Sequence, residues 1–210
     1  MTQVHCMLLR GLNVIVTQAA PVATRGTSTD VRDFMHFVRS WVIAVIYHHD
    51  GEETFLFPGL QTIVGNPDAF ADEMGQHRTM HARLETVREY ARRILDTREV
   101  GVEEYKGRKG RDLKRLCEEL ADVLVVHLSD EVQALQGADM RNTDEKQLKA
   151  HATAFEAHLT GDTRPEVFEV IMPILLGCSE KGFRGSDFPT VPFFFPYLIH
   201  YWYARKYHGA

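Results

Sequence analysis

Apolar residues recur every three or four positions along most of this chain, which is the spacing of an amphipathic α-helix. The first such segment covers about residues 3–20 and is expected to end at Pro21, because proline disrupts a helix. The second begins near Thr29, since threonine can cap a helix, and it is expected to stop at Pro58 after residue 57. No strand pattern competes with these helices.

Two further segments complete a set of four long helices. Asn66 and Pro67 predict the start of the third, because Asn caps a helix and Pro takes its first position. This helix is expected to continue to about Thr97, and a charged loop that contains glycine is expected over residues 100–110. The fourth helix is predicted over residues 111–135, where leucine and valine form an apolar stripe.

The pattern changes beyond the fourth helix. Residues 143–159 predict a polar amphipathic helix, and residues 165–176 predict a short one that Pro173 must kink or end. A stretch rich in glycine, proline and aromatic residues follows over residues 183–196, and then a final aromatic segment. This part of the chain is therefore expected to add to the four helices rather than to extend their pattern.

Short connections between the four long helices favour an up-and-down arrangement. The chain is therefore predicted to be all-α, with an antiparallel up-and-down four-helix bundle over residues 1–136. Residues 137–210 are predicted to form a C-terminal helical and aromatic extension that packs on the bundle. The 210 residues suffice for one large domain with a substantial core, so we expect a single domain overall.

Composition and charge narrow the class of protein. The net charge is −5 and no basic stripe is present, so neither nucleic acid nor an anionic membrane is an expected partner. Three cysteines without a C-x-x-C spacing indicate a reducing compartment. No signal pattern and no long apolar run is evident. We therefore expect a soluble, cytoplasmic protein whose oligomeric state is open.

Histidine is the unusual residue of this chain, with 11 copies. Seven potential metal ligands fall on the four long helices, and three of these helices carry two of them four positions apart. Such a spacing turns the side chain by only ~40°, so both members of a pair lie on one helix face. The seven residues are His5, His48, Glu52, His77, His81, His127 and Glu131.

In an up-and-down bundle these seven residues share one end. Five imidazoles and two carboxylates that converge there predict a site for two metal ions. The mixture of nitrogen and hard oxygen donors suits iron, and such sites also accept manganese or a mixed pair. His36 is excluded, because it lies about 18 Å along the helix axis from His48. His151 and His158 are predicted to lie on a solvated face.

With their neighbours, these residues resemble the hemerythrin family, and more closely its HHE cation-binding branch. The resemblance covers about residues 1–136. It rests on His5, on the HHDGEE block at residues 48–53 with Leu-Phe-Pro at residues 56–58, on His77-x-x-x-His81 and on the His-Leu-Ser-Asp-Glu block at residues 127–131. The HHDGEE block and the aromatic C-terminal tail also resemble stand-alone hemerythrin-like proteins of fungi.

The resemblance implies an arrangement of ligands around two non-haem iron ions. The implied ligands are His77, His81 and His127 for one iron and His5 and His48 for the other, with Glu52 and Glu131 as bridges. An oxo or hydroxo group would complete the bridge, and the iron with fewer histidines would keep an open position for O2. Oxygen-carrying hemerythrins have His-x4-Asp in the fourth helix, whereas this chain has His-x3-Glu, which argues against a pure carrier.

His49 and Glu53 stand 100° round the helix from His48 and Glu52. In a functional role they orient the ligands, supply a proton or act as a further ligand. The alternative is that they face solvent or pair with each other.

Two functions from different classes remain open. The first is a di-iron oxidase or oxygenase that acts on a small organic substrate. In this hypothesis the aromatic residues of the extension form a pocket that excludes water. The alternative is that these residues only enlarge the hydrophobic core or form a dimer surface. These residues are Phe183, Phe188, Phe193, Phe194, Phe195, Tyr197, Tyr201, Trp202 and Tyr203. The second is reversible O2 binding, or O2 or iron sensing, because five neutral imidazoles donate little negative charge. Iron storage is a weaker third hypothesis, since no cage-forming signature is present.

Overall fold

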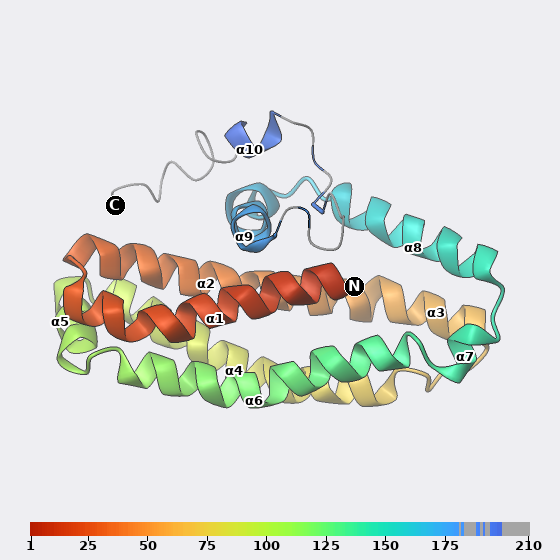
Figure 1. The fold of residues 1–210 in the computed structure, drawn as a ribbon, viewed down its shortest axis with the longest axis horizontal. Helices are drawn as coiled ribbons and strands as arrows, with labels where there is room; N and C mark the ends of the chain where they lie inside the picture. Colours follow the sequence, from red (N-terminus) through yellow and green to blue (C-terminus); the bar gives the residue numbers. More distant parts are fainter. Residues whose placement is uncertain (181, 183–187, 190, 192–193, 199–210) are drawn as a thin grey trace.

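Four long helices pack side by side in the computed structural model, which describes residues 1–180, 182, 188–189, 191 and 194–198 (Figure 1). They are α1 (Thr2–Arg25), α2 (Ser28–Gly51), α4 (Ala71–Asp96) and α6 (Arg111–Ala134). Helix α2 contacts α1 and α4, and α6 contacts the same two helices, so the four form a closed ring. No strand occurs among the described residues, and the predicted all-α helical bundle is confirmed.

Shorter helices extend this ring and cover one side of it. They are the π-helical η1 (Glu52–Leu56), α3 (Phe57–Val64), α5 (Glu99–Gly107), α7 (Ala138–Arg141), α8 (Glu145–Thr160), the π-helical η2 (Val167–Ile171), α9 (Met172–Cys178) and α10 (Phe195–Leu198). Helix α8 contacts α3 and η1, and α9 contacts α1 and α2. The C-terminal helices therefore lie on the α1–α2 side of the bundle (Figure 1).

The prediction that Pro58 ends the second helix is wrong, because a π-helical turn accommodates the proline. The backbone N–H of Phe57 donates to the carbonyl oxygen of Glu52, five residues earlier, and Pro58 then falls in the first turn of α3. A proline there removes no bond that the wider turn needs. The helix ends instead at Gly65, whose φ of 75° is left-handed. The same arrangement recurs at Pro173, between η2 and α9.

Two other predicted boundaries are also wrong. Helix α1 continues through Pro21 to Arg25, because Ala23 is buried in the bundle and packing there outweighs the ~3 kcal/mol that an internal proline costs. Asn66 caps a turn rather than a helix, since its Oδ1 accepts from the backbone N–H of Asp68 at 3.0 Å. Helix α4 therefore begins later than predicted.

The charged segment that was expected to be a loop forms helix α5. Val102 and Tyr105 are fully buried, and the Tyr105 hydroxyl donates to the carbonyl oxygen of Ala19 at 2.7 Å. Two apolar side chains three positions apart therefore fix α5 against α1, despite the charges around them.

Helix α8 packs one of its histidines on the bundle, so the prediction of a solvated face is wrong for His151. Its Nε2 donates to the carbonyl oxygen of Leu56 at 2.9 Å, its ring stacks on Phe55, and it fills the space where a side chain on Gly59 would lie. His158 is exposed, although its ring also stacks on Phe55. The lack of a side chain at Gly59 allows this close approach.

Helix α1 carries much of the core. Leu8 and Ile15 are fully buried, and Gly11 lies against the ring of Trp41, whose Nε1–H donates to the carbonyl oxygen of Leu8 at 2.9 Å. By length and composition alone α1 is apolar enough to cross a membrane, a criterion that buried helices of bundles also meet. The expected cytoplasmic location stays a prediction.

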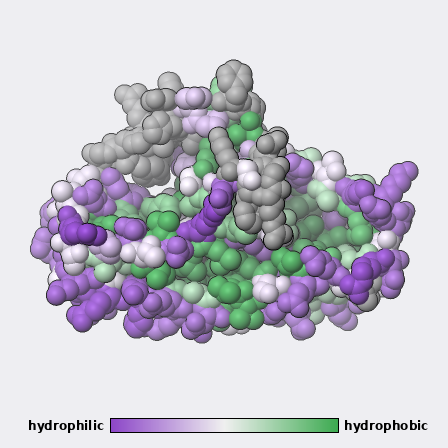
Figure 2. All heavy atoms as spheres, viewed as in Figure 1, coloured by the Kyte–Doolittle hydropathy of each residue, from purple (hydrophilic) through white to green (hydrophobic). Residues whose placement is uncertain are grey.

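Hydrophobic residues also reach the surface on the face formed by α1 and α6. Figure 2 shows them along the middle of the face formed by α1 and α6, with hydrophilic residues at both ends and along the lower edge. Val14 of α1 and Val126 of α6 are among the exposed hydrophobic side chains. Helix α1 is therefore apolar beyond the stripe that the core requires.

The contact between Gly11 and Trp41 predicts a packing defect on substitution. A Cβ atom in Gly11→Ala would overlap the indole ring, so we expect the free energy of unfolding to fall by about 1–3 kcal/mol. Gly177→Ala is the matched control, because no atom lies within 4 Å of the added carbon there. Urea denaturation of both variants measures the effect, and equal stabilities would contradict this account of the core.

Candidate metal centre

The bundle brings two groups of potential metal ligands together in its interior. Within each group, the candidate ligand atoms lie within 4.8 Å of one another. One group comprises His5, His48, Glu52 and Glu131, and the other comprises His49, His77 and His127. All seven residues are buried. Six of the seven ligands that the sequence predicts fall in these groups, and His49 is the additional member.

The end of α2 and the start of η1 supply three of these residues. On a helical wheel Glu52 stands ~40° from His48 and ~60° from His49, so it lies between them. One helix can therefore present a histidine to each group and a carboxylate between the two.

Both carboxylates face both groups. Glu52 Oε1 lies 3.0 Å from His48 Nε2, and Glu52 Oε2 lies 3.7 Å from His77 Nε2. Glu131 Oε2 lies 3.2 Å from His5 Nε2 and 3.8 Å from His127 Nε2. This placement is the one that a pair of bridging carboxylates requires.

Three of the histidines are oriented by acceptors at their other ring nitrogen. The pairs are His5 Nδ1 with the carbonyl oxygen of Leu128 at 3.1 Å, His77 Nδ1 with Glu53 Oε1 at 2.8 Å, and His127 Nδ1 with Gln76 Oε1 at 2.9 Å. Because all three partners are oxygen acceptors, each Nδ1 carries the proton and each Nε2 presents a lone pair to the interior.

Asp130 fixes the orientation of the Gln76 amide. Gln76 Nε2 donates to Asp130 Oδ2 at 3.0 Å, so its carbonyl oxygen is the atom that faces His127. The Nε2 atoms of His77 and His127 then lie 3.0 Å apart with a lone pair on each. Two such lone pairs repel each other unless a cation lies between them.

Burial dominates the electrostatics of the site. It lowers the pKa of His48 to about 3 and that of His127 to about 4, so both imidazoles are neutral at pH 7. Burial, with the nearby Glu131, raises the pKa of Glu52 well above its usual value.

The unpaired polar atoms of the interior fit a metal cation. Eight buried nitrogen and oxygen atoms on five residues make no hydrogen bond: His5 Nε2, His48 Nε2, both ring nitrogens of His49 and both carboxylate oxygens of Glu52 and Glu131. The pairs His48–Glu52 and His5–Glu131 are therefore close but lack hydrogen-bond geometry. Buried polar atoms without partners are rare, and a cation is the partner that these donors share.

Not every predicted residue joins the two groups. His81 is half-buried and belongs to neither, so its ligand role stays a prediction. His36, which the sequence excludes, is also absent from both. Glu53 contacts His77, in keeping with the hypothesis that it orients a ligand. Sequence reasoning missed Gln76, because no spacing rule marks an amide that holds a ligand from another helix.

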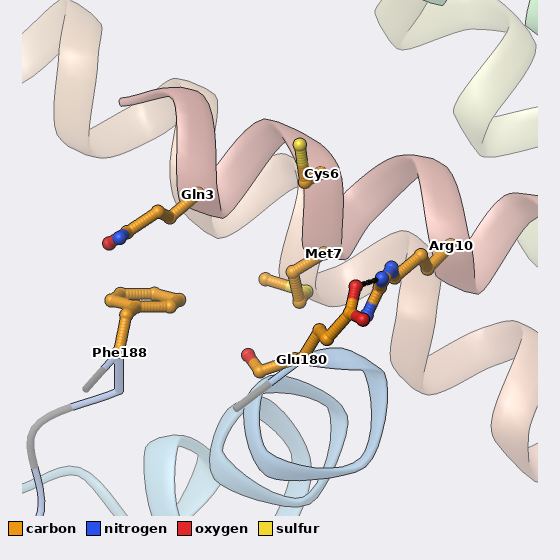
Figure 3. A pocket seen from close by; sticks show the side chains of 7 residues that line it. Gln3, Cys6, Met7, Arg10, Glu180 and Phe188 are labelled. Carbon is orange, nitrogen blue, oxygen red and sulfur yellow. Dashed lines mark ion pairs between the residues drawn. The ribbon is translucent and has the colours of Figure 1, made fainter. Parts of the chain in front are cut away.

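The aromatic extension is described only in part. Phe183, Phe193, Tyr201, Trp202 and Tyr203 lie outside the described residues. Phe188 faces the first turns of α1, where it lines a pocket of about 20 Å³ beside Gln3 and Cys6 (Figure 3). Arg10 of α1 forms an ion pair with Glu180 at the same pocket. This space holds about one water molecule, so it is too small for an organic substrate.

The fold and this cluster of buried histidines and carboxylates define a cation-binding helical bundle. Residues 1–138 match the Hemerythrin HHE cation binding domain, and the chain belongs to this family. The chain is also similar to the "Dimeric xanthone biosynthesis cluster protein R11" of Cryptosporiopsis sp. (strain 8999). That protein is 29% identical over 212 residues, which cover 100% of this chain and 74% of the relative. No solved structure matches.

The hydrogen bonds of Gln76 predict its effect on cation affinity. Gln76→Leu removes the acceptor that orients His127, so we expect binding to weaken about 10–100-fold with the helical content unchanged. Gln133→Leu, at an exposed position of α6, is the control. Titration against a chelator of known affinity measures both, and an unchanged affinity in Gln76→Leu would refute the positioning role.

The lowered imidazole pKa values predict how the centre responds to acid. Because burial holds the pKa of His48 at about 3 and that of His127 at about 4, against 6.5 for free histidine, protons compete poorly with a cation. We expect bound metal to be retained below pH 6.5 and lost as the pH falls toward those values. Metal analysis after gel filtration at a series of pH values tests this. Release that is complete at pH 6.5 is the contrary result.

Proposed function

We propose that this chain is a non-haem di-iron protein that binds and activates O2, as an oxidase or oxygenase of a small organic substrate. The observation that carries the proposal is the pair of buried ligand groups joined by Glu52 and Glu131, whose oxygens face both. Imidazole nitrogen with bridging carboxylate oxygen is a donor set that suits iron.

A bound iron pair supplies the electrons and the open coordination positions that O2 chemistry requires. The chain orients the imidazole ligands and keeps water out of the centre. The backbone and side-chain acceptors around His5, His77 and His127 hold each imidazole in one tautomer, and full burial of Glu52 and Glu131 keeps bulk water away.

Glu53 connects the centre with solvent. Its side chain is 38% exposed, whereas that of His77, which donates to it from Nδ1, is fully buried. A partly exposed carboxylate in contact with a buried imidazole can exchange a proton with water while it keeps the ring in place. Because His77 Nδ1 already carries the proton that it donates, we assign Glu53 the role of holding the His77 ring with Nε2 toward the centre.

The similarity to the cluster protein supports a small organic substrate. The name of that relative places it in a biosynthesis cluster for dimeric xanthones, and the alignment covers this chain in full, including residues beyond the domain match. A role in small-molecule biosynthesis explains why residues outside the cation-binding bundle are shared.

Reversible O2 binding, or O2 or iron sensing, is the second candidate. The observation that favours it is the excess of neutral donors, since the two groups contain five histidines and two glutamates. Fewer negative ligands stabilise oxidised iron less, which would let O2 leave unchanged.

Anaerobic loading with Fe2+, followed by exposure to O2 and a panel of small organic metabolites, separates the two candidates. We expect two irons per chain, O2 consumption and oxidised product, with ¹⁸O₂ distinguishing an oxygenase from an oxidase. His127→Ala, which removes one ligand of the centre, is expected to abolish the product. Recovery of intact O2 with every metabolite unchanged would overturn the enzymatic proposal in favour of the second candidate.

A further inference from the structure

We propose that His49 is a metal ligand and that it takes, beside His77 and His127, the place that the family resemblance implies for His81. The inference rests on the proposed function only in requiring that the centre binds two cations. It does not depend on the reaction with O2.

The first observation is the isolation of the His49 imidazole from every hydrogen-bonding partner. The side chain is completely buried, and neither Nδ1 nor Nε2 makes a hydrogen bond. Burial of a polar group without a hydrogen bond is unfavourable in a protein interior, and this ring has two such nitrogens. A structural histidine would find a carbonyl or a hydroxyl. One that coordinates a cation needs only an open lone pair toward it.

The second observation is the place of the ring among the other ligands. The His49 ring stacks on that of His77 with centroids 4.1 Å apart, and it meets the ring of His127 edge-on at 5.2 Å. A nitrogen of each of these three rings lies within 4.8 Å of the others. The three residues come from α2, α4 and α6, so one cation would tie three helices together.

The third observation concerns the surroundings of α2 at this level. Adjacent helical residues point ~100° apart, and normally only one of them faces a bundle interior. Here Phe155 and Leu159 of α8 cover α2 at Gly51, ~60° round the helix from His48 and ~160° from His49, and both histidines are buried. The two histidines of the HHDGEE block therefore serve different cations, with Glu52 between them.

His81 lacks these features. It is one helical turn from His77, ~6 Å deeper along α4, only half-buried, and outside both ligand groups. The i,i+4 spacing that marks it in the sequence places it on the face of His77, but the ring that stacks on His77 is that of His49 from α2.

The test compares cation stoichiometry in matched variants. The full chain, His49→Phe, His81→Ala and His36→Ala are loaded with Co2+, which reports nitrogen and oxygen ligation through its visible absorption, and excess metal is removed. His49→Phe keeps an aromatic ring on His77 but has no lone pair. His49→Gln is the second variant, should the phenyl ring disturb folding, and circular dichroism verifies the helical content of each protein.

We expect two Co2+ per chain in the unsubstituted protein, in His81→Ala and in His36→Ala, and one in His49→Phe and His49→Gln. Two Co2+ in both folded His49 variants would overturn the assignment while leaving the proposed function intact. Loss of one Co2+ from His81→Ala would restore His81 as the ligand and also overturn it. Fewer than two Co2+ in the unsubstituted protein would refute both this inference and the di-iron proposal.

Discussion

The interior of this bundle holds two carboxylates and five histidines where a helical bundle normally holds aliphatic side chains. Burial keeps His48 and His127 neutral, so protonated imidazoles do not balance the carboxylates. An ionised carboxylate without compensating charge would destabilise the fold, because removing a charge from water costs several kcal/mol. Cations that bind between these residues satisfy the unpaired atoms and the charge together, which links folding of the bundle to metal binding.

The π-helical turn at the end of α2 lies at the candidate metal centre. Glu52 begins the π-helical segment η1, and the next residue, Glu53, reaches His77 from the partly exposed side. Short π-helical segments are frequent at functional sites because they rotate side chains away from the α-helical spacing. The same turn admits Pro58, so the helix runs on as α3 and offers α8 a surface on which His151 packs.

Much of the fold could be read from the sequence, because apolar spacing reports directly on the helix face that is buried. This spacing predicted the helical bundle and the bounds of α6. The errors share one cause: a local signal was given too much weight. Pro21 and Pro58 are helix breakers in isolation, and the charges near Tyr105 favour a loop, but packing in the interior offsets these costs of a few kcal/mol.

The sequence by itself determined the chemistry of the centre: the type of each donor, the pairs at a spacing of four and their common level in the bundle. Only the tertiary structure decided which side chains meet. Helical spacing fixes a residue's direction relative to its own axis, but not the rotation of that axis relative to neighbouring helices. That rotation places His49 rather than His81 beside His77, and it brings Gln76 to His127. Contacts between helices therefore select which of the candidate ligands meet, and the periodicity of one helix does not contain that information.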